Sequence, residues 1–192
     1  MLSETRIPGQ RVAITDDDTG VPTREWFRYL EYLNTVAAAV VTNAAFYDTT
    51  STAWTANTPT IVPVGSTYAT HGFSLSTSRI TVAGAGRCII SASLQLTNNN
   101  ASSDDDMTLW LRVNGADATA TSRRATVPMQ HASVAGSVLM TVNFSYTFAA
   151  GDYFELYGLS TLGYAQIATY AASSSPAYPA APGTILTVAQ IL

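Results

Sequence analysis

The chain has 192 residues, which is enough for one domain of ordinary size plus an appendage. Charged residues make up only 11% of it, against about 25% in typical soluble domains, so we expect part of its uncharged surface to be buried against other subunits. The net charge is −4, and the nine basic residues are all Arg and are scattered apart from Arg123–Arg124, which argues against a nucleic-acid partner.

Residues 1 to about 22 are predicted to form an irregular arm, because Pro8-Gly9 and Asp16–Gly20 are turn signals. The opening sequence MLSETRIPGQR carries early charges and no apolar core, so we expect no ordinary signal peptide. The most apolar run, Val36–Val41, is far too short to span a bilayer, and no membrane partner is predicted. An arm of this kind needs a partner to become ordered.

Residues 23 to about 41 are predicted to form a helix, with Thr23 as its cap and Glu25 in its first turn, where the helix dipole favours negative charge. Its apolar residues follow heptad spacing over about two repeats: Trp26, Leu30, Leu33, Ala37 and Val40. Such a helix can lie on the domain, form a small three-helix bundle, or dock as a plug into a larger assembly.

Residues 44–70 are rich in Thr, Ser, Ala and Pro, and we interpret them as a linker that runs into a first strand near Thr60–Tyr68. From residue 71 onward apolar and polar residues alternate with period two, most clearly over Ile90–Leu96, Met107–Val113 and Val138–Phe148. Turn signals separate about eight such strands, with no helical pattern between them. The predicted fold is all-β: an antiparallel jelly-roll β-sandwich preceded by an N-terminal arm and a short α-helix. The predicted division is 1–41 for the arm and helix, 42–59 for the linker and 60–192 for the sandwich.

The closing strand, Thr184–Leu192, is apolar on both faces. Leu186, Val188 and Leu192 fall on one face, and Ile185, Ala189 and Ile191 on the other. One face of a sandwich strand meets the core, so the other needs a cover, and the simplest cover is a neighbouring subunit.

Three stretches of the chain resemble the C1q/TNF-like trimeric jelly roll in the form found in bacteriophage structural proteins. They are Ile80–Ser93, where a glycine turn precedes a long strand; Phe144–Leu156, where Gly-Asp joins two strands; and Pro179–Val188, a proline-marked loop entering the closing strand. The stretch Asp18–Leu30 also looks like the opening of many phage fibre and capsid-associated proteins. The similarities cover most of the chain, although a collagen-like Gly-X-Y stalk is missing, which favours the phage form.

The resemblance implies a homotrimer anchored by its N-terminus on a virion, which is assembled in the cytoplasm of a bacterial host. The partner of the N-terminal arm would be the major capsid protein or another virion protein, and the trimer would act as a capsid decoration, cement or head-fibre protein. The residues predicted for the trimer interface are Ile185, Leu186, Val188, Ile191, Tyr153 and Tyr157. Those predicted for anchoring on the virion are Trp26, Phe27, Tyr29, Leu30 and Leu33.

A receptor-binding tip of a tail fibre is the alternative function. It would recognise a host surface glycan or protein through the aromatic and Asn/Asp-rich loops 97–106 and 162–180. Tyrosines in the second half of the chain suit either role, since they form binding surfaces and fill interfaces equally well.

Residues that could perform chemistry are few, and we predict neither an enzyme nor a cofactor. The two histidines, His71 and His131, are assigned to ordinary surface or interface positions, with a shared metal site on a threefold axis as the alternative. Cys88 is assigned to the interior as a structural thiol. The acidic runs Asp16–Asp18 and Asp104–Asp106 are interpreted as turns and solvated loops, with Ca²⁺ binding as the alternative. A cell-wall hydrolase would need a pair of carboxylates, and no pair stands out.

Overall fold

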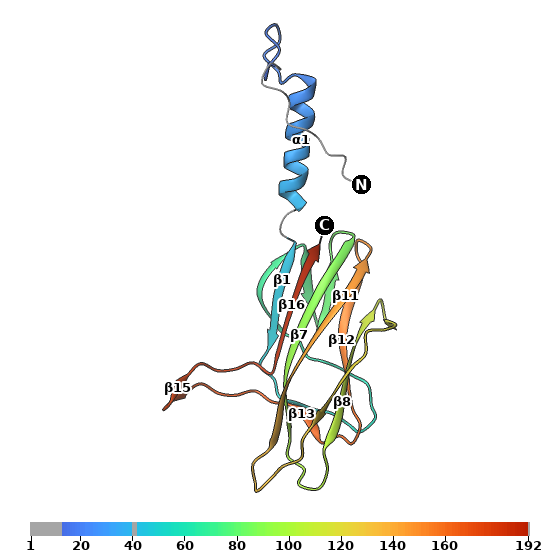
Figure 1. Cartoon of the computed structure of the whole chain (residues 1–192), viewed down its shortest axis with the longest axis vertical. Helices are drawn as coiled ribbons and strands as arrows, with labels where there is room; N and C mark the ends of the chain where they lie inside the picture. The colour runs from blue at the N-terminus through green and yellow to red at the C-terminus, as the bar shows by residue number, and fades with distance from the viewer. Residues whose placement is uncertain (1–12, 40–41, 192) are drawn as a thin grey trace. The chain divides into compact units, whose positions relative to one another are not determined.

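The computed structural model describes residues 13–39 and 42–191, with side chains in the helix described as far as Leu33. The chain divides into two compact units, one ending at Val41 and the other spanning Thr42–Ile191. The first unit contains the helix α1 (Arg24–Ala39), which begins directly after Thr23 as predicted (Figure 1). Val40 and residues 1–12 of the predicted arm lie outside the described residues, as does Leu192.

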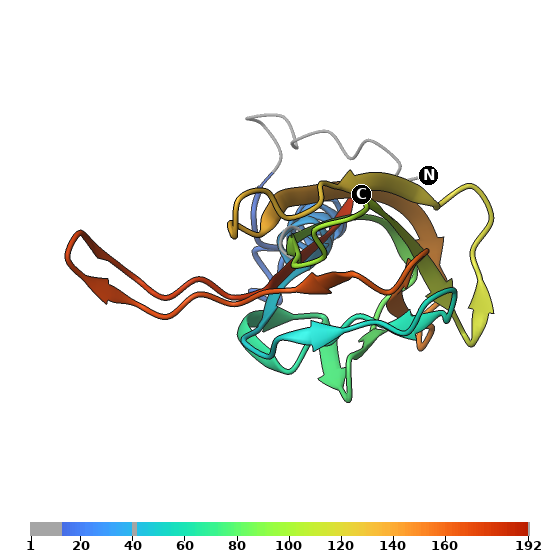
Figure 2. The same cartoon turned by 90° about the horizontal axis from the view of Figure 1, so that it is seen from below.

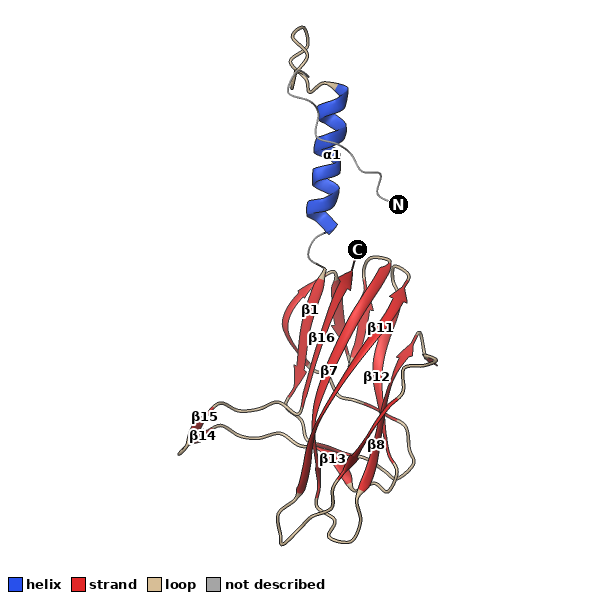
Figure 3. Ribbon diagram, in the orientation of Figure 1, coloured by secondary structure: helices blue, strands red, loops and turns tan. Residues whose placement is uncertain are grey.

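The second unit is built almost entirely from antiparallel strands, which Figure 3 shows in red. Sheet 1 has the order β2-β13-β7-β16-β1-β4, with β11 on the other side of β7. Its strands are β1 (Asn43–Asp48), β2 (Thr52–Ala53), β4 (Ser66–His71), β7 (Gly86–Asn98), β11 (Gly136–Phe148), β13 (Ala165–Ile167) and β16 (Thr184–Ile191).

Sheet 2 has the order β10-β8-β12-β6-β5, with β3 added to β12 and β9 added to β8. Its strands are β3 (Thr60–Ile61), β5 (Phe73–Ser76), β6 (Arg79–Val82), β8 (Asp105–Val113), β9 (Ala116–Asp117), β10 (Arg123–Val127) and β12 (Tyr153–Ser160). The chain crosses between the sheets from β6 to β7, from β7 to β8, from β10 to β11 and from β11 to β12. This alternation of strands between two antiparallel sheets makes the predicted jelly-roll sandwich.

The core lies between the two sheets and follows the predicted alternation. The even-numbered residues of β7 from Cys88 to Leu96 are at most 1% exposed, and so are the odd-numbered residues Met107–Leu111 of β8. In β11 the residues Met140, Val142, Phe144 and Phe148 are buried in the same way. Strict period-two patterns therefore fixed both the strands and their inward faces.

The predicted linker 42–59 is corrected by the structure. β1 occupies Asn43–Asp48 and pairs with β16 on one side and β4 on the other, so it lies inside sheet 1. Phe46 is fully buried, and Trp54 is 4% exposed in the core. The inward positions of β1 are Ala44, Phe46 and Asp48. Only one of them is a large apolar residue, so the sequence shows no apolar alternation that would predict this strand.

The turns between strands carry the predicted residues. Asn114 and Gly115 both have positive φ, 49° and 82°, between β8 and β9, which is the type I′ geometry that an Asn-Gly turn favours. Gly151 between β11 and β12 has φ 85°.

A second hairpin projects from the sandwich between β13 and β16, and we call residues 168–183 the projecting hairpin (Figures 1 and 2). At its base Ala168 N–H donates to the Gln95 carbonyl and Gln95 N–H donates to the Gly183 carbonyl, both at 2.9 Å. Further out, Tyr170 pairs with Ala181, and the two-residue strands β14 (Ser173–Ser174) and β15 (Ala177–Tyr178) pair with each other.

Candidate interaction surface

The outward-facing side chains of sheet 1 form a surface with one formal charge, and we call it the neutral face. Because side chains alternate along a strand, these are the residues between the core positions. Its single charged residue is Arg87, whose Nε donates to Ser145 Oγ at 2.8 Å. The neutral face comprises Asn43, Ala45 and Tyr47 of β1; Tyr68, Ala69 and His71 of β4; Arg87, Ile89, Ser91, Ser93 and Gln95 of β7; Ser137, Leu139, Thr141, Asn143, Ser145 and Thr147 of β11; and Ile185, Thr187, Ala189 and Ile191 of β16.

Strand register joins these residues into continuous rows. One row runs from Thr141 through Ser93 and Ile185 to Tyr47, and Tyr47 stacks on Tyr68 with ring centroids 4.2 Å apart. The aliphatic side chains of the face are open to solvent: Leu139 is 65% exposed, Ile89 46%, Ile191 44% and Ile185 38%. Single exposed apolar residues are ordinary, but a whole sheet face with one charge has the composition of an interface core.

The outward-facing side chains of sheet 2 form the opposite kind of surface, and we call it the paired face. It carries three ion pairs between Arg and Asp or Glu, each joining neighbouring strands. It comprises Arg79 and Thr81 of β6; Asp106, Thr108, Trp110 and Arg112 of β8; Asp117 of β9; Arg124 and Thr126 of β10; and Tyr153, Glu155, Tyr157 and Leu159 of β12.

Each charge of the paired face is matched within the subunit. Arg79 bonds Glu155 at 3.1 Å, and its guanidinium lies 3.8 Å from the centroid of the Tyr153 ring. Glu155 is 7% exposed, so this pair neutralises an otherwise buried carboxylate.

The same arrangement is repeated one strand further along. Arg112 Nε donates to Asp117 at 2.8 Å, and its guanidinium lies 4.0 Å from the Tyr157 ring centroid. Trp110 Nε1 donates to the same carboxylate oxygen at 2.7 Å, and the bonds from Arg112 and Trp110 lower the pKa of Asp117. Arg124 pairs with Asp106, which also accepts a bond from Thr126 Oγ1 at 2.6 Å.

The six residues predicted for the trimer interface do not form one surface. Ile185 and Ile191 lie on the neutral face and are exposed, as an interface residue of a separate subunit must be. Leu186 and Val188 are 0% and 2% exposed, so their assignment to an interface is corrected: they face the core of their own sandwich. Tyr153 and Tyr157 lie on the paired face beneath Arg79 and Arg112. The alternation along β16 correctly separates its inward residues from its outward residues, but the prediction assigns residues of both faces to the interface.

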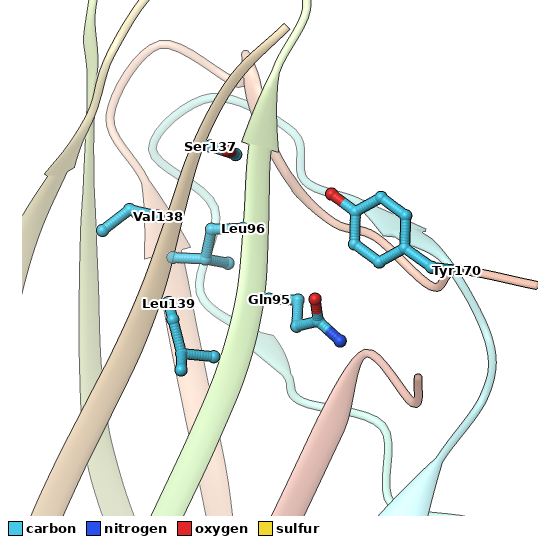
Figure 4. Close-up of a pocket in the computed structure, with 6 residues that line it drawn as sticks. All are labelled: Gln95, Leu96, Ser137, Val138, Leu139 and Tyr170. Carbon is cyan, nitrogen blue, oxygen red and sulfur yellow. The ribbon is translucent and has the colours of Figure 1, made fainter. Parts of the chain in front are cut away.

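A shallow hollow of about 250 Å³ opens on the neutral face where β7 and β11 run beside the base of the projecting hairpin. Figure 4 shows Gln95 and Tyr170 on one side of β7, with Ser137 and Leu139 on the β11 side. Gln95 Nε2 donates to the Pro182 carbonyl at 2.9 Å, which fixes this wall of the hollow to the hairpin. The walls offer hydroxyl, amide and aliphatic groups and no charge.

The five residues predicted for anchoring lie on α1. Trp26 and Tyr29 are half-buried and meet edge to face, with ring centroids 5.8 Å apart. Phe27, Leu30 and Leu33 are 53%, 47% and 41% exposed. Spacing of three residues places these three on one side of the helix, so α1 presents an aliphatic and aromatic stripe to solvent within its own unit.

The chain before α1 is closed into a turn by Asp16. Its carboxylate accepts bonds from Asp18 N–H, Thr19 N–H and Thr19 Oγ1 at 3.0–3.1 Å, and these bonds, led by those from Thr19, lower its pKa. Gly20 N–H donates to the Asp16 carbonyl at 2.8 Å. The run Asp16–Asp18 therefore has the geometry of an Asx turn.

The three carboxylates of the second acidic run, Asp104–Asp106, each bind different partners. Asp104 accepts a bond from Met129 N–H at 2.8 Å, and Asp106 pairs with Arg124. Asp105 is 1% exposed and accepts bonds from Ser160 Oγ and from the N–H groups of 162, 164 and 165. Burial raises the pKa of Asp105, but these hydrogen bonds outweigh burial and hold its pKa below the ordinary value.

Within residues 13–39 and 42–191, no three His, Cys, Asp or Glu side chains gather into a group that could hold a metal ion. His71 is exposed at the end of β4, and His131 is exposed in the turn before β11. Cys88 is fully buried, as predicted, and burial raises the pKa of its thiol.

The loops at the end of the sandwich farthest from Asn43 form a further surface, which we call the distal loops (99–104, 128–135 and 161–164). They are tied together, since Gln130 N–H donates to the Asn100 carbonyl at 2.7 Å and Thr161 N–H to the Asp106 carbonyl at 3.0 Å. Several large apolar side chains point outward from them, with exposed fractions of 39–70%: Met129, Val134, Leu162 and Tyr164.

No helix in the described part of the chain is both long and apolar enough to cross a membrane. No protein-family model matches the sequence, and a search of curated proteins finds no match.

Proposed function

We propose that this chain is a structural protein of a bacteriophage virion: a homotrimer held together through the neutral face and anchored by the unit that ends at Val41. The observation that carries the proposal is the contrast between the two outer faces of one sandwich. In a monomer, both outer faces would meet water, and nothing would favour placing the charges on sheet 2 while five of the seven strands of sheet 1 stay almost uncharged. In a subunit that buries the outer face of sheet 1 against another subunit, this distribution is expected.

The phage context of the proposal is supported by the motif resemblance, and the fold is compatible with it. The role as capsid decoration, cement or head fibre is supported by the two-unit organisation, with an exposed stripe on α1. The anchoring partner would be the major capsid protein or another virion protein. A non-enzymatic role is part of the proposal, and it is supported by the buried carboxylates of Asp105 and Glu155, which are bound by structural partners.

Deletion of residues 1–41 tests the division of labour. We expect the truncated protein to remain a folded trimer and to be lost from virions, measured by light scattering and by quantifying the protein in purified particles. The matched control replaces Phe27, Leu30 and Leu33 by Ser in the full-length chain, which removes the exposed stripe and leaves the rest of the unit in place. Normal incorporation of both variants would contradict anchoring through this unit, and a monomeric wild-type protein would contradict the trimer.

A receptor-binding tip of a tail fibre is the second candidate, favoured by the distal loops. Their outward Met129, Leu162 and Tyr164 sit on a backbone fixed by Asp104 and Asp105, and a rigid loop with exposed aromatic and aliphatic side chains suits recognition at small entropic cost. The test is adsorption of the purified protein to permissive host cells and to their isolated surface glycans. Loss of adsorption in a Leu162→Ser, Tyr164→Ser variant would support this function, and no adsorption by the wild-type protein would contradict it.

A further inference from the structure

The projecting hairpin has the properties of an element that is completed by another chain. Residues 168–183 contain no charged residue, and nearly all of 170–180 is exposed. Its only internal ladder bonds are those between Tyr170 and Ala181 and those joining β14 to β15. A two-stranded ribbon without a sheet or core behind it is marginally stable in water, so a docking surface is expected for it.

The hairpin leaves the sandwich in a definite direction. β13 and β16 both pair with β7 on the side opposite β11, and the hairpin joins them. Figures 1 and 2 show it extending away from the sandwich on the β1 side, whereas the hollow beside Leu139 lies on the β11 side. A copy's own hairpin tip therefore does not fill its own hollow. Only Tyr170, at the hairpin base, lines it.

Resting on the trimer proposed above, we propose that the hairpin of each copy docks on the neutral face of the next copy and places Tyr178 in the hollow lined by Gln95, Ser137 and Leu139. Two different patches meet in such a contact, and contacts of this kind close into a ring when the rotation between copies is suitable. The β1 side of one subunit then faces the β11 side of the next.

Size and chemistry agree with this docking. From Ala168 to the turn at Ser175 the hairpin reaches roughly 25 Å at about 3.3 Å per residue. A face of five strands spaced about 4.8 Å apart is roughly 20 Å wide, so the hairpin can cross it. The hollow of about 250 Å³ is larger than a cavity of about 150 Å³ that accommodates benzene, so it has room for an aromatic ring. Tyr178 is 51% exposed and Leu139 65%, and both would lose that exposure.

Directed cross-linking tests the contact. Full-length Tyr178→Cys and Leu139→Cys chains, carrying different tags, are co-expressed and oxidised, and disulfide-linked chains are separated without reductant. We expect most linked pairs to join the two tags. The matched control replaces Leu139→Cys by Thr81→Cys on the paired face, for which we expect at least tenfold less product. Wild-type protein, whose Cys88 is fully buried, reports background.

The mass of the wild-type protein, measured in parallel, separates the two proposals. A trimer without the mixed cross-link, or with links only between two Tyr178→Cys chains, would overturn the docking and leave the trimer standing. A wild-type monomer would overturn both.

A second variant keeps the test independent of cysteine chemistry. Residues 171–180 are replaced by a Gly-Gly turn between Tyr170 and Ala181, whose backbones already pair at 2.9–3.0 Å. We expect the dissociation constant of the trimer to rise at least tenfold while the melting temperature of the isolated subunit stays unchanged. Tyr178→Ala should reproduce part of this rise and Tyr178→Phe should not. An unchanged dissociation constant in all three variants would overturn the docking.

Discussion

The outer faces of the two sheets differ in how many charged residues they carry and in how those charges are paired. The paired face matches Arg79, Arg112 and Arg124 with carboxylates of the same subunit and stacks two of these guanidiniums on tyrosines. The neutral face has Arg87 as its one formally charged residue, and otherwise Ser, Thr, Asn, Gln, Ala, Tyr, His71 and exposed aliphatic residues. The low overall charge of the chain is therefore not spread evenly over its surface. The outer face of sheet 2 has its charges neutralised within the subunit, and the outer face of sheet 1 is the one that the proposed trimer would bury.

A charge placed on the neutral face should have the largest effect on assembly. Ile89→Arg puts an unpaired cation beside Ala189 on the neutral face. Because burying an unpaired charge costs several kcal/mol, we expect the dissociation constant of the trimer to rise at least about 100-fold. Analytical ultracentrifugation measures the change. Thr81→Arg on the paired face is the control, and equal loss of trimer in both variants would show that the two faces are not distinct.

Adjacent positions of β16 should separate the core from the contact. Leu186→Ala empties a fully buried site and should lower the free energy of unfolding of the subunit by about 2–5 kcal/mol. Ile185→Ala, one residue away on the neutral face, should lower it by less than about 1 kcal/mol and weaken the trimer instead. Chemical denaturation of dilute subunits measures the first quantity. A large loss of subunit stability in Ile185→Ala would contradict the assignment of the two faces.

Asp105 fastens the segment where the chain passes from sheet 2 to sheet 1, and its loss should affect folding and leave both outer faces intact. Asp105→Asn brings amide hydrogens against the N–H donors of Leu162, Tyr164 and Ala165, and we expect a loss of about 2 kcal/mol at pH 7. Since the pKa of Asp105 is lowered in the fold, its contribution is present above the ordinary value of 3.8 and is lost as pH falls through the folded pKa.

The stability difference between wild type and Asp105→Asn should therefore shrink below about pH 3.8, as followed by thermal unfolding at a series of pH values. Asp104→Asn is the matched control, because Asp104 is a more exposed neighbour that accepts a bond from Met129 N–H. A difference that stays constant down to pH 2 would show that the charge of Asp105 is not what holds the segment.

The smallest effect is expected on the paired face. Arg79→Ala leaves the 7%-exposed Glu155 without its cation, and we expect a loss of about 1 kcal/mol in subunit stability and an unchanged trimer. The double variant Arg79→Ala, Glu155→Gln should recover part of the loss. Dissociation of the trimer by Arg79→Ala would show that the paired face also belongs to a contact.

Most of the sandwich could be predicted because its long strands alternate strictly. Val138–Phe148 identifies both β11 and its inward face, and Asn114-Gly115 identifies a turn. β1 escaped prediction because its inward residues include a small Ala and a polar Asp, so no apolar alternation marks it. Its place is decided by pairing with β16 and β4, which are far away in sequence.

Only part of the neutral face could be predicted from the sequence. Ile185 and Ile191 were found because apolar residues on both sides of a strand are conspicuous. Ile89 and Leu139 were not predicted. The positions between the core residues of β7 and β11 carry no charge except Arg87, and this lack of charged residues could have indicated a buried outer face. The paired face could not be derived, since its ion pairs join residues up to 76 positions apart along the chain.

The position of β16 also determines when sheet 1 can be completed during synthesis. β16 lies between β1 and β7, so the middle of sheet 1 is missing until residues 184–191 have left the ribosome. The neutral face spans all three of these strands and does not exist as a surface before that moment. A nascent chain can pair β11 with β7 before β16 is made, but in the proposed trimer it offers no complete contact to a neighbouring copy. If the proposed trimer forms through this face, association is confined to subunits that have finished folding, which lowers the risk of joining partly made chains on a crowded polysome.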